Sequence, residues 1–201
     1  MNSPNPIDRK GFTLIEMLVV IAIIAVLASL LIPAITRTLG SAKRSRAAAD
    51  ARDIASAVEM FFDDYGYFPV PHSDQGYPGG SGADDTNIPD YETWKEESKR
   101  IIQVLIAEPQ NYNQDHQLNP QQKIYITGQG IQSDGTFLDP WGTQYFIKLD
   151  RDYDGKVEFL SQPEQYRTRV IVVSAGSSRG LTGGENNRNE RDNVANVRLG
   201  R

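Results

Sequence analysis

The feature that most limits the fold of this chain is one apolar run near its start. The run reads FTLIEMLVVIAIIAVLASLLI and covers 21 residues, from Phe12 to Ile32. A helix rises about 1.5 Å per residue, so a run of this length spans roughly the 30 Å hydrocarbon core of a bilayer. The run therefore predicts a helix that crosses a membrane. One carboxylate, Glu16, interrupts it, and any interpretation has to explain that charge.

Two ordinary interpretations fit this run less well. A secretory signal peptide has an apolar region of about 7 to 15 residues followed by a small-residue cleavage site, whereas here the small residue, Gly11, precedes the run. A simple membrane anchor needs no acid, and a charged side chain at the centre of a membrane helix costs about 2.5–3.5 kcal/mol. An interpretation in which the acid has a partner accounts for the charge.

The residues around this acid resemble a known processing signal. The stretch Arg9-Lys10-Gly11-Phe12-Thr13-Leu14-Ile15-Glu16 resembles the prepilin signal of type IV pilins and of the pseudopilins of type II secretion. The resemblance implies that prepilin peptidase cuts after Gly11 and that the new amino terminus on Phe12 is methylated. Arg9 and Lys10 would hold that end in the cytoplasm, because positive charges favour the cytoplasmic side.

The same resemblance implies a role for Glu16 in assembly. After cutting it becomes the fifth residue, and its carboxylate is expected to meet the amino terminus of a neighbouring subunit. An unpaired ion in an apolar environment is penalised heavily, so this pair would favour one stagger between adjacent helices. Pro33, where such chains commonly carry proline, is the second expected assembly residue. It removes a helical hydrogen bond and leaves a kink or a stretch that can melt.

Helical periodicity continues beyond the apolar run to about Asp64. There the stretch Tyr65-Gly66-Tyr67-Phe68-Pro69 predicts a helix end with a glycine cap. Residues 71–90 are rich in Gly, Pro, Asp and Ser and predict an exposed loop. The chain is therefore expected to comprise a leader (1–11), a membrane and filament-core helix (12–33), an amphipathic helix (34–65) and a globular head (66–201).

The head is expected to combine a second helix with an antiparallel sheet. Apolar residues recur at helical spacing from about 91 to 107, and strand-like runs follow at 123–127, 143–149, 156–160 and 168–174. Three or four strands packed on the long helix make an α+β, pilin-like fold. The stretch Asp139-Pro140-Trp141-Gly142 predicts a turn, and with the strand after it resembles the head of the major pseudopilin of type II secretion.

An acidic loop between two of these runs has the spacing of a calcium-binding motif. Oxygen donors fall at positions 1, 3, 5, 7 and 9 of an EF-hand-like pattern, supplied by Asp150, Asp152, Asp154, the Lys156 carbonyl and Glu158. Ser161 stands where the motif has a bidentate Glu, so affinity would fall to about 10⁻⁴ to 10⁻³ M. The alternative is a hairpin that turns at Asp154-Gly155 and whose acids are simply solvated.

Resemblance to the major pseudopilins also implies a calcium loop near the C-terminus. Ser177, Ser178 and Arg179 replace the acids expected there. The remaining candidate donors are Glu185, Asn187 and Asp192.

Composition argues against several classes of protein. The chain has no cysteine, which excludes disulfides, thiolate metal sites and thiol catalysis. Its formal charge of −5 argues against a nucleic-acid partner. His72 and His116 stand alone in polar stretches, and no nucleophile has a base placed beside it in the sequence. We therefore expect no enzyme and no catalytic residues, and Ca²⁺ is the one cofactor to consider.

The resemblance to pseudopilins implies a structural subunit of a type II secretion pseudopilus, a filament assembled in the bacterial inner membrane to help drive protein export. The head would lie in the periplasm. Expected partners are further copies of the chain, other pseudopilins, prepilin peptidase and the inner-membrane platform of the secretion system. Two alternatives stay open: a type IV pilin for adhesion, motility or DNA uptake, and a membrane-tethered calcium-dependent binding module that uses residues 71–90 for recognition.

Overall fold

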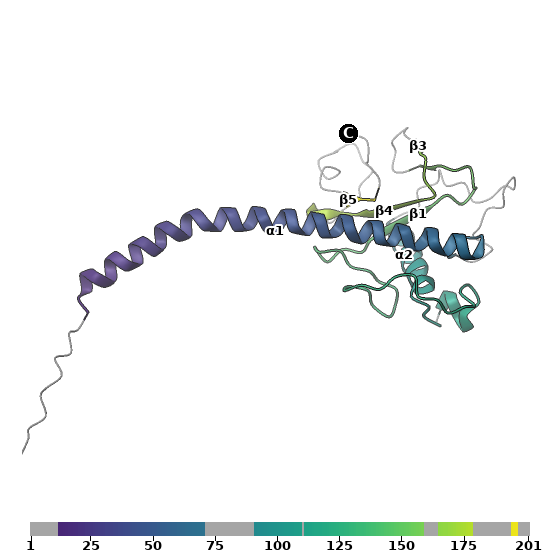
Figure 1. The fold of residues 1–201 in the computed structure, drawn as a ribbon, viewed down its shortest axis with the longest axis horizontal. Helices are drawn as coiled ribbons and strands as arrows, with labels where there is room; N and C mark the ends of the chain where they lie inside the picture. Colours follow the sequence, from purple (N-terminus) through teal and green to yellow (C-terminus); the bar gives the residue numbers. More distant parts are fainter. Residues whose placement is uncertain (1–11, 71–90, 110, 159–164, 179–193, 197–201) are drawn as a thin grey trace, which may run out of the picture. The chain divides into compact units, whose positions relative to one another are not determined.

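The computed structural model describes residues 12–70, 91–109, 111–158, 165–178 and 194–196, which form an α+β protein, as expected (Figure 1). The helices are α1 (Leu14–Tyr65) and α2 (Tyr91–Leu105), with short 3-10 helices η2 (Asn111–His116) and η3 (Gly176–Ser178). The strands are β1 (Phe146–Leu149), β2 (Val157–Glu158), β3 (Gln165–Tyr166), β4 (Val170–Ser174) and β5 (Val194–Ala195).

The chain divides into two compact units between residues 42 and 43, and α1 contributes to both of them. The first unit contains residues 12–32, called here the apolar segment. The second unit, called here the head, contains α1 from residue 43 onward and all the other described helices and strands. The predicted leader (1–11) and the predicted loop (71–90) lie outside the described residues.

Within the head, α1 buries one face and ends at a glycine. The buried side chains on that face recur three or four positions apart, at Ala47, Ala51, Ile54, Val58 and Phe61, all with no exposed surface. Such spacing places them on a single stripe of the helix. Just beyond α1, Gly66 takes a left-handed φ of +74°, and its N–H donates to the Phe62 carbonyl at 2.7 Å. The predicted glycine cap is confirmed.

The strands of the head form two separate antiparallel sheets. The larger sheet has the order β1-β4-β5, with Phe146 opposite Val173 and Leu149 opposite Val170. The smaller sheet pairs β2 with β3. Strands β1 and β2, although consecutive in the chain, therefore belong to different sheets.

Strand β4 is buried on both faces of the larger sheet. Val170 and Val172 join the main core, which also contains residues of α1 and α2. Ile171 and Val173 face the other way and form a second cluster with Val157 of β2. The uninterrupted run VIVVS in β4 has this burial pattern because both faces are covered.

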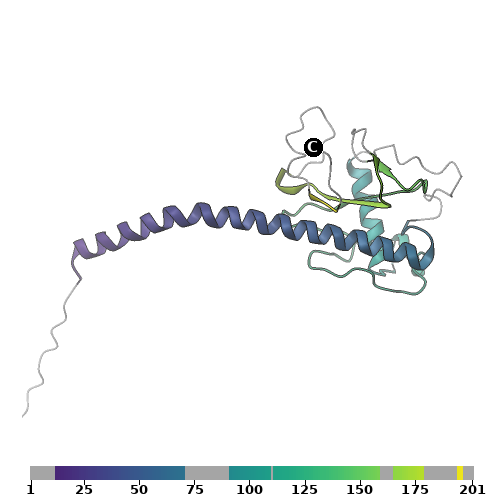
Figure 2. The ribbon, with the colours of Figure 1, turned by 45° about the horizontal axis from the view of Figure 1, so that its top comes forward.

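Helix α2 packs on β1 through hydrogen bonds as well as apolar contacts. The buried Ser98 hydroxyl accepts from the Ile147 N–H at 2.9 Å, and the Gln144 side chain donates to the Lys95 carbonyl at 2.8 Å. Figure 2 shows α2 crossing the part of α1 that lies in the head at a steep angle. Side chains of α1, α2, β1 and β4 meet there in one core.

One of the predicted strands is wrong, and β1 and β4 are shorter than the strands predicted at 143–149 and 168–174; the end of the strand predicted at 156–160 lies outside the described residues. Residues 123–127 pair with no strand in the part of the chain that the structure describes. Instead, the Tyr125 N–H donates to the Leu105 carbonyl at 2.8 Å, and the Tyr125 hydroxyl donates to Asp64 Oδ2 at 2.7 Å. Tyr125 and Ile126 are buried in the main core and Ile124 is 59% exposed, so the run covers the core between the ends of α1 and α2 without joining a sheet.

The predicted turn at residues 139–142 is confirmed, and it is tied to the sheet. The Gly142 N–H donates to the Asp139 carbonyl at 2.9 Å. Asp139 Oδ1 accepts the N–H groups of Trp141 and Thr143, and Oδ2 accepts the Ser174 hydroxyl at 2.6 Å. One buried carboxylate thus joins the turn to the end of β4.

Candidate functional site

The apolar segment presents its large side chains outward all round the helix. Phe12, Leu14 and Leu30 are 78%, 84% and 71% exposed. A helix that is apolar on every side is typical of a large protein core or a membrane, and α1 is the one described helix that is long and apolar enough to cross a membrane. Exposed apolar surface of this extent marks a region that other molecules cover.

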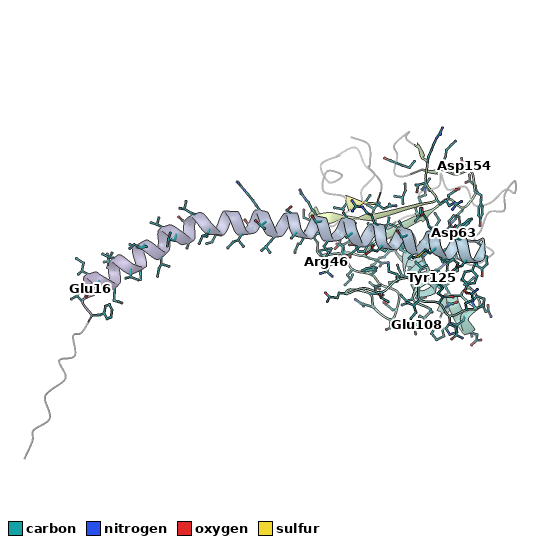
Figure 3. All side chains as sticks on the ribbon, viewed as in Figure 1. Glu16, Arg46, Asp63, Glu108, Tyr125 and Asp154 are labelled. Carbon is teal, nitrogen blue, oxygen red and sulfur yellow. The ribbon has the colours of Figure 1, made fainter. Side chains whose placement is uncertain are left out.

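Glu16 lies at the start of α1 (Figure 3), where it forms a reciprocal capping box with Thr13. The Thr13 N–H and the Thr13 hydroxyl both donate to Glu16 Oε2, at 2.8 and 2.7 Å. In return, the Glu16 N–H donates to Thr13 Oγ1 at 3.3 Å. This arrangement satisfies donors at the first turn, which no helical carbonyl can reach. Oε1 accepts from neither Thr13 group and is available to a further donor.

The sequence interpretation missed Thr13. The signal was present, because a Thr followed three residues later by a Glu is the pattern of a capping box. The predicted pairing of Glu16 with the amino terminus of another subunit stays a prediction.

The other predicted residues of this region have mixed outcomes. Gly11 lies outside the described residues, and Phe12 is exposed ahead of α1. Helix α1 is continuous through Pro33, so the structure contains no melted stretch there. The predicted role of Pro33 in assembly stays a prediction.

The acidic loop brings three of its predicted ligands together. One carboxylate oxygen from each of Asp150, Asp152 and Asp154 lies within 4.8 Å of the other two. Among the residues that the structure describes, this is the one group of three or more possible metal-ligating side chains found so close. The Lys156 backbone is described, whereas the side chain of Glu158 and the whole of Ser161 lie outside the described residues.

Asp150 is the buried member of this loop. Asp150 is only 2% exposed, and its Oδ2 accepts a hydrogen bond from the Gly155 N–H at 2.9 Å. Oδ1 is buried and has no hydrogen-bond partner among the described residues. Burial, followed by the neighbouring Asp152, raises the pKa of Asp150 to about 6, against the Gly155 hydrogen bond, which lowers it. An ionised oxygen with no donor is costly at such a position.

The backbone of the loop turns tightly around these acids. Asp152 Oδ1 accepts the Asp154 N–H at 3.3 Å, and Asp154 Oδ1 accepts the Lys156 N–H at 2.8 Å. Tyr153 and Gly155 take left-handed φ values of +61° and +81°. The Lys156 ammonium lies 3.6 Å from Asp154 Oδ2.

The hairpin of the alternative interpretation is wrong for this loop, although Asp154 is exposed to solvent. Its flanking strands β1 and β2 lie in different sheets, so Asp154 and Gly155 do not turn one strand back on the other. The loop instead packs on the end of α1, where the Tyr153 ring lies 6.0 Å from Phe62 and 5.4 Å from Phe68, centroid to centroid.

The remaining candidates for chemistry show no assembled site. His72 and the C-terminal donors Glu185, Asn187 and Asp192 lie outside the described residues. The Ser174 hydroxyl, in the SAGSS stretch, donates to Asp139 Oδ2 rather than facing a histidine.

Comparison with known proteins places these features in context. Residues 8–32 match the prokaryotic N-terminal methylation motif. Over 153 residues the chain is 35% identical to the type II secretion system core protein G of Klebsiella pneumoniae, an alignment that covers 76% of this chain and 83% of that protein. The protein of the same name from Pectobacterium carotovorum subsp. carotovorum is 29% identical over 155 residues, with 76% and 74% covered.

Similarity to pilins covers less of the chain. The type IV major pilin protein PilE of Neisseria gonorrhoeae is 36% identical over 73 residues, which are 36% of this chain and 44% of that protein. No solved structure shows a significant match to the chain.

Proposed function

The chain belongs to the family of type II secretion system core protein G, and we propose how it enters the filament of that family. It is a structural subunit of a pseudopilus, anchored in a membrane by its N-terminal helix. We place that anchor in the bacterial inner membrane and the head in the periplasm. The single observation that carries this proposal is the exposure of the apolar segment on all sides, which lipid covers before assembly and other copies of the helix cover afterwards.

The processing step follows from the residues before the apolar segment. Prepilin peptidase cuts after Gly11, and Phe12 becomes the methylated amino terminus. Arg9 and Lys10 precede the cut, and their charges keep this end on the cytoplasmic side. The match of residues 8–32 to the methylation motif supports this step.

Glu16 then sets the position of each subunit against the next. In the single chain, Thr13 satisfies Oε2, which lowers the cost of placing the carboxylate in lipid. Oε1 is left to accept from the amino terminus of a neighbouring subunit. A new subunit would gain this charge-assisted hydrogen bond only at the correct stagger, because a shift along the helix leaves both charges unpaired in an apolar environment.

The partners of this filament are other copies of the chain, other pseudopilins and the inner-membrane platform of the secretion system. A secretion role is favoured over a type IV pilin role by the longer alignments to the core protein G relatives.

Mass spectrometry of the protein purified from membranes tests the proposal. The expected result is a chain that begins at Phe12 and carries one methyl group on its amino terminus. A chain that keeps residues 1–11 would overturn filament processing and favour the membrane-tethered binding module. A Gly11→Leu variant is the matched control, because blocking the cut should leave the leader in place without changing the head.

A further inference from the structure

We propose that the loop from Asp150 to Lys156 is a calcium-binding site of the head, with Asp150, Asp152 and Asp154 as its carboxylate ligands. The site belongs to the head alone, so it goes beyond the proposed role in the filament and does not depend on it. The starting observation concerns Asp150, which is only 2% exposed: its buried Oδ1 has no hydrogen-bond partner in the part of the chain that the structure describes. A bound cation would give this oxygen the partner that the protein does not supply.

The spacing of the carboxylates suits a calcium ion. Calcium binds oxygen at about 2.3–2.6 Å, so two ligands on opposite sides of the ion lie roughly 4.6–5.2 Å apart. The three carboxylate oxygens lie within 4.8 Å of one another, which lets all of them reach one ion. Every candidate donor is an oxygen, and calcium and magnesium prefer oxygen ligands, whereas zinc and copper favour nitrogen or sulfur.

The charges on described residues near the loop do not neutralise the three acids. The Lys156 ammonium lies 3.6 Å from Asp154 Oδ2, on the exposed member of the group, and it adds one positive charge against three negative ones. Arg151 forms its ion pair with Glu97 of α2.

The position of the loop explains what a bound ion would do. Asp150 follows β1 directly, and its N–H donates to the Arg169 carbonyl beside β4 at 2.9 Å. Tyr153 packs on Phe62 near the end of α1, and Figure 3 shows Asp154 at the same end of the head as Asp63. An ion bound here would stabilise the contact between α1 and the loop that connects β1 with β2. The free energy of unfolding of the head would then depend on calcium.

Thermal unfolding of the full-length protein in detergent micelles tests this site. With calcium added after chelation, the midpoint is expected to rise by about 3–6 °C when calcium reaches ten times its dissociation constant. Without the bidentate Glu of an EF-hand, that constant is expected at about 10⁻⁴ to 10⁻³ M. A midpoint that does not move at 10 mM calcium, or that moves equally with magnesium, overturns the proposal.

Two variants separate this loop from any other site. Asp152→Asn should lose most of the calcium-induced rise, whereas the matched control Asp53→Asn, an exposed aspartate of α1, should keep it. An equal rise in both variants places calcium elsewhere and overturns the proposal.

Asp150→Asn gives a second test, because calcium should change the effect of this substitution on stability, whereas a purely structural role would not make the effect depend on calcium. Without calcium, this variant should be at least as stable as the wild type, because it removes a buried charge that has no partner. With calcium, it should be less stable than the wild type. If Asp150→Asn is less stable than the wild type by the same amount in chelator and in calcium, the carboxylate has only a structural role and the proposal fails. If the variant does not fold, the comparison of Asp152→Asn with Asp53→Asn still tests whether calcium binds this loop.

Discussion

The apolar side chains of α1 are buried by the head in one part of the helix and exposed in the other. In the head, Ile54 and Phe61 have no exposed surface, because α2 and the larger sheet cover that face. In the apolar segment, Leu14 and Leu30 are 84% and 71% exposed. One part of the helix is stabilised by its own chain, and the other needs lipid or further subunits. Substitutions in the two parts should therefore change different measurements.

The sequence pattern gives the physical reason for this difference. Around Ile54, charged residues such as Arg52, Asp53 and Glu59 occupy the solvent side, so only one face of the helix is apolar. The apolar segment has a single charge, Glu16, in 21 residues. A one-sided helix can be covered by one small domain, whereas a helix that is apolar all round has to be surrounded.

The largest effect on head stability is expected for Phe61→Ala. Its ring packs against those of Tyr65, Tyr67 and Tyr125, with centroids 4.6, 5.8 and 5.3 Å away. Removing a fully buried aromatic ring costs about 3–5 kcal/mol, a large share of the roughly 5–15 kcal/mol that stabilises a domain. The unfolding midpoint of the head, measured by near-UV circular dichroism in detergent, should fall sharply.

Leu31→Ala is the matched substitution in the apolar segment, where this side chain is 58% exposed. It should change the free energy of unfolding of the head by no more than about 0.5 kcal/mol. If Leu31→Ala destabilised the head as much as Phe61→Ala, the apolar segment would contribute to the stability of the head, which contradicts the division of α1 into two parts.

The next effect concerns assembly. Glu16→Ala should insert into membranes normally and leave head unfolding unchanged, but reduce the yield of sheared filaments by about tenfold or more. Loss of one partner of a buried ion pair costs about 3–5 kcal/mol, and about 1.4 kcal/mol already corresponds to a factor of ten. Ile21→Leu, which keeps an exposed apolar side chain, is the control. Normal filament yield from Glu16→Ala would rule out the proposed pair.

A smaller effect on the head is expected for Ser174→Ala. The substitution removes the 2.6 Å hydrogen bond to Asp139 Oδ2 and leaves a buried carboxylate oxygen without that donor. A buried acceptor that loses its partner costs about 1–3 kcal/mol. Urea unfolding should show the loss, whereas Ser133→Ala, on an exposed loop residue, should show little. Equal midpoints for the two variants would mean that the turn at residues 139–142 is stable without the link to β4.

The smallest effect should appear in the pH dependence of Lys123→Met. Hydrogen bonds from Lys123, and then from Tyr125, hold the pKa of Asp64 below its usual range. A lowered pKa means that the ionised carboxylate contributes stability above the unfolded-state pKa of about 3.9, and that this contribution is lost as pH falls through the folded-state pKa. The difference between the wild type and the variant should be present at pH 7 and shrink below about pH 3.

The pH profile also separates two roles of Lys123. Its ammonium lies 4.8 Å from the centre of the Tyr125 ring as well as beside Asp64. A difference between the wild type and the variant that stays constant from neutral to acidic pH would assign the effect to packing on this ring rather than to the charge on Asp64.

The sequence by itself determined the features that depend on neighbouring residues in the chain. The length of α1 follows from an uninterrupted helical pattern, its end from Gly66 with a positive φ, and the turn at 139–142 from Pro140 and Gly142. The close approach of three acids also follows from their spacing in one short loop. The capping box of Thr13 and Glu16 was equally readable from four adjacent residues.

Only the tertiary structure decided which segments pair and which acids are buried. Residues 123–127 have a strand-like pattern, but no strand among the described residues pairs with them, so they are held by the ends of the two helices. The separation of β1 and β2 into two sheets removed the hairpin alternative and left Asp150 buried with an unpaired oxygen. Strand pairing and burial join residues far apart in the chain, and an alternating pattern says which face is apolar without saying which neighbour will cover it.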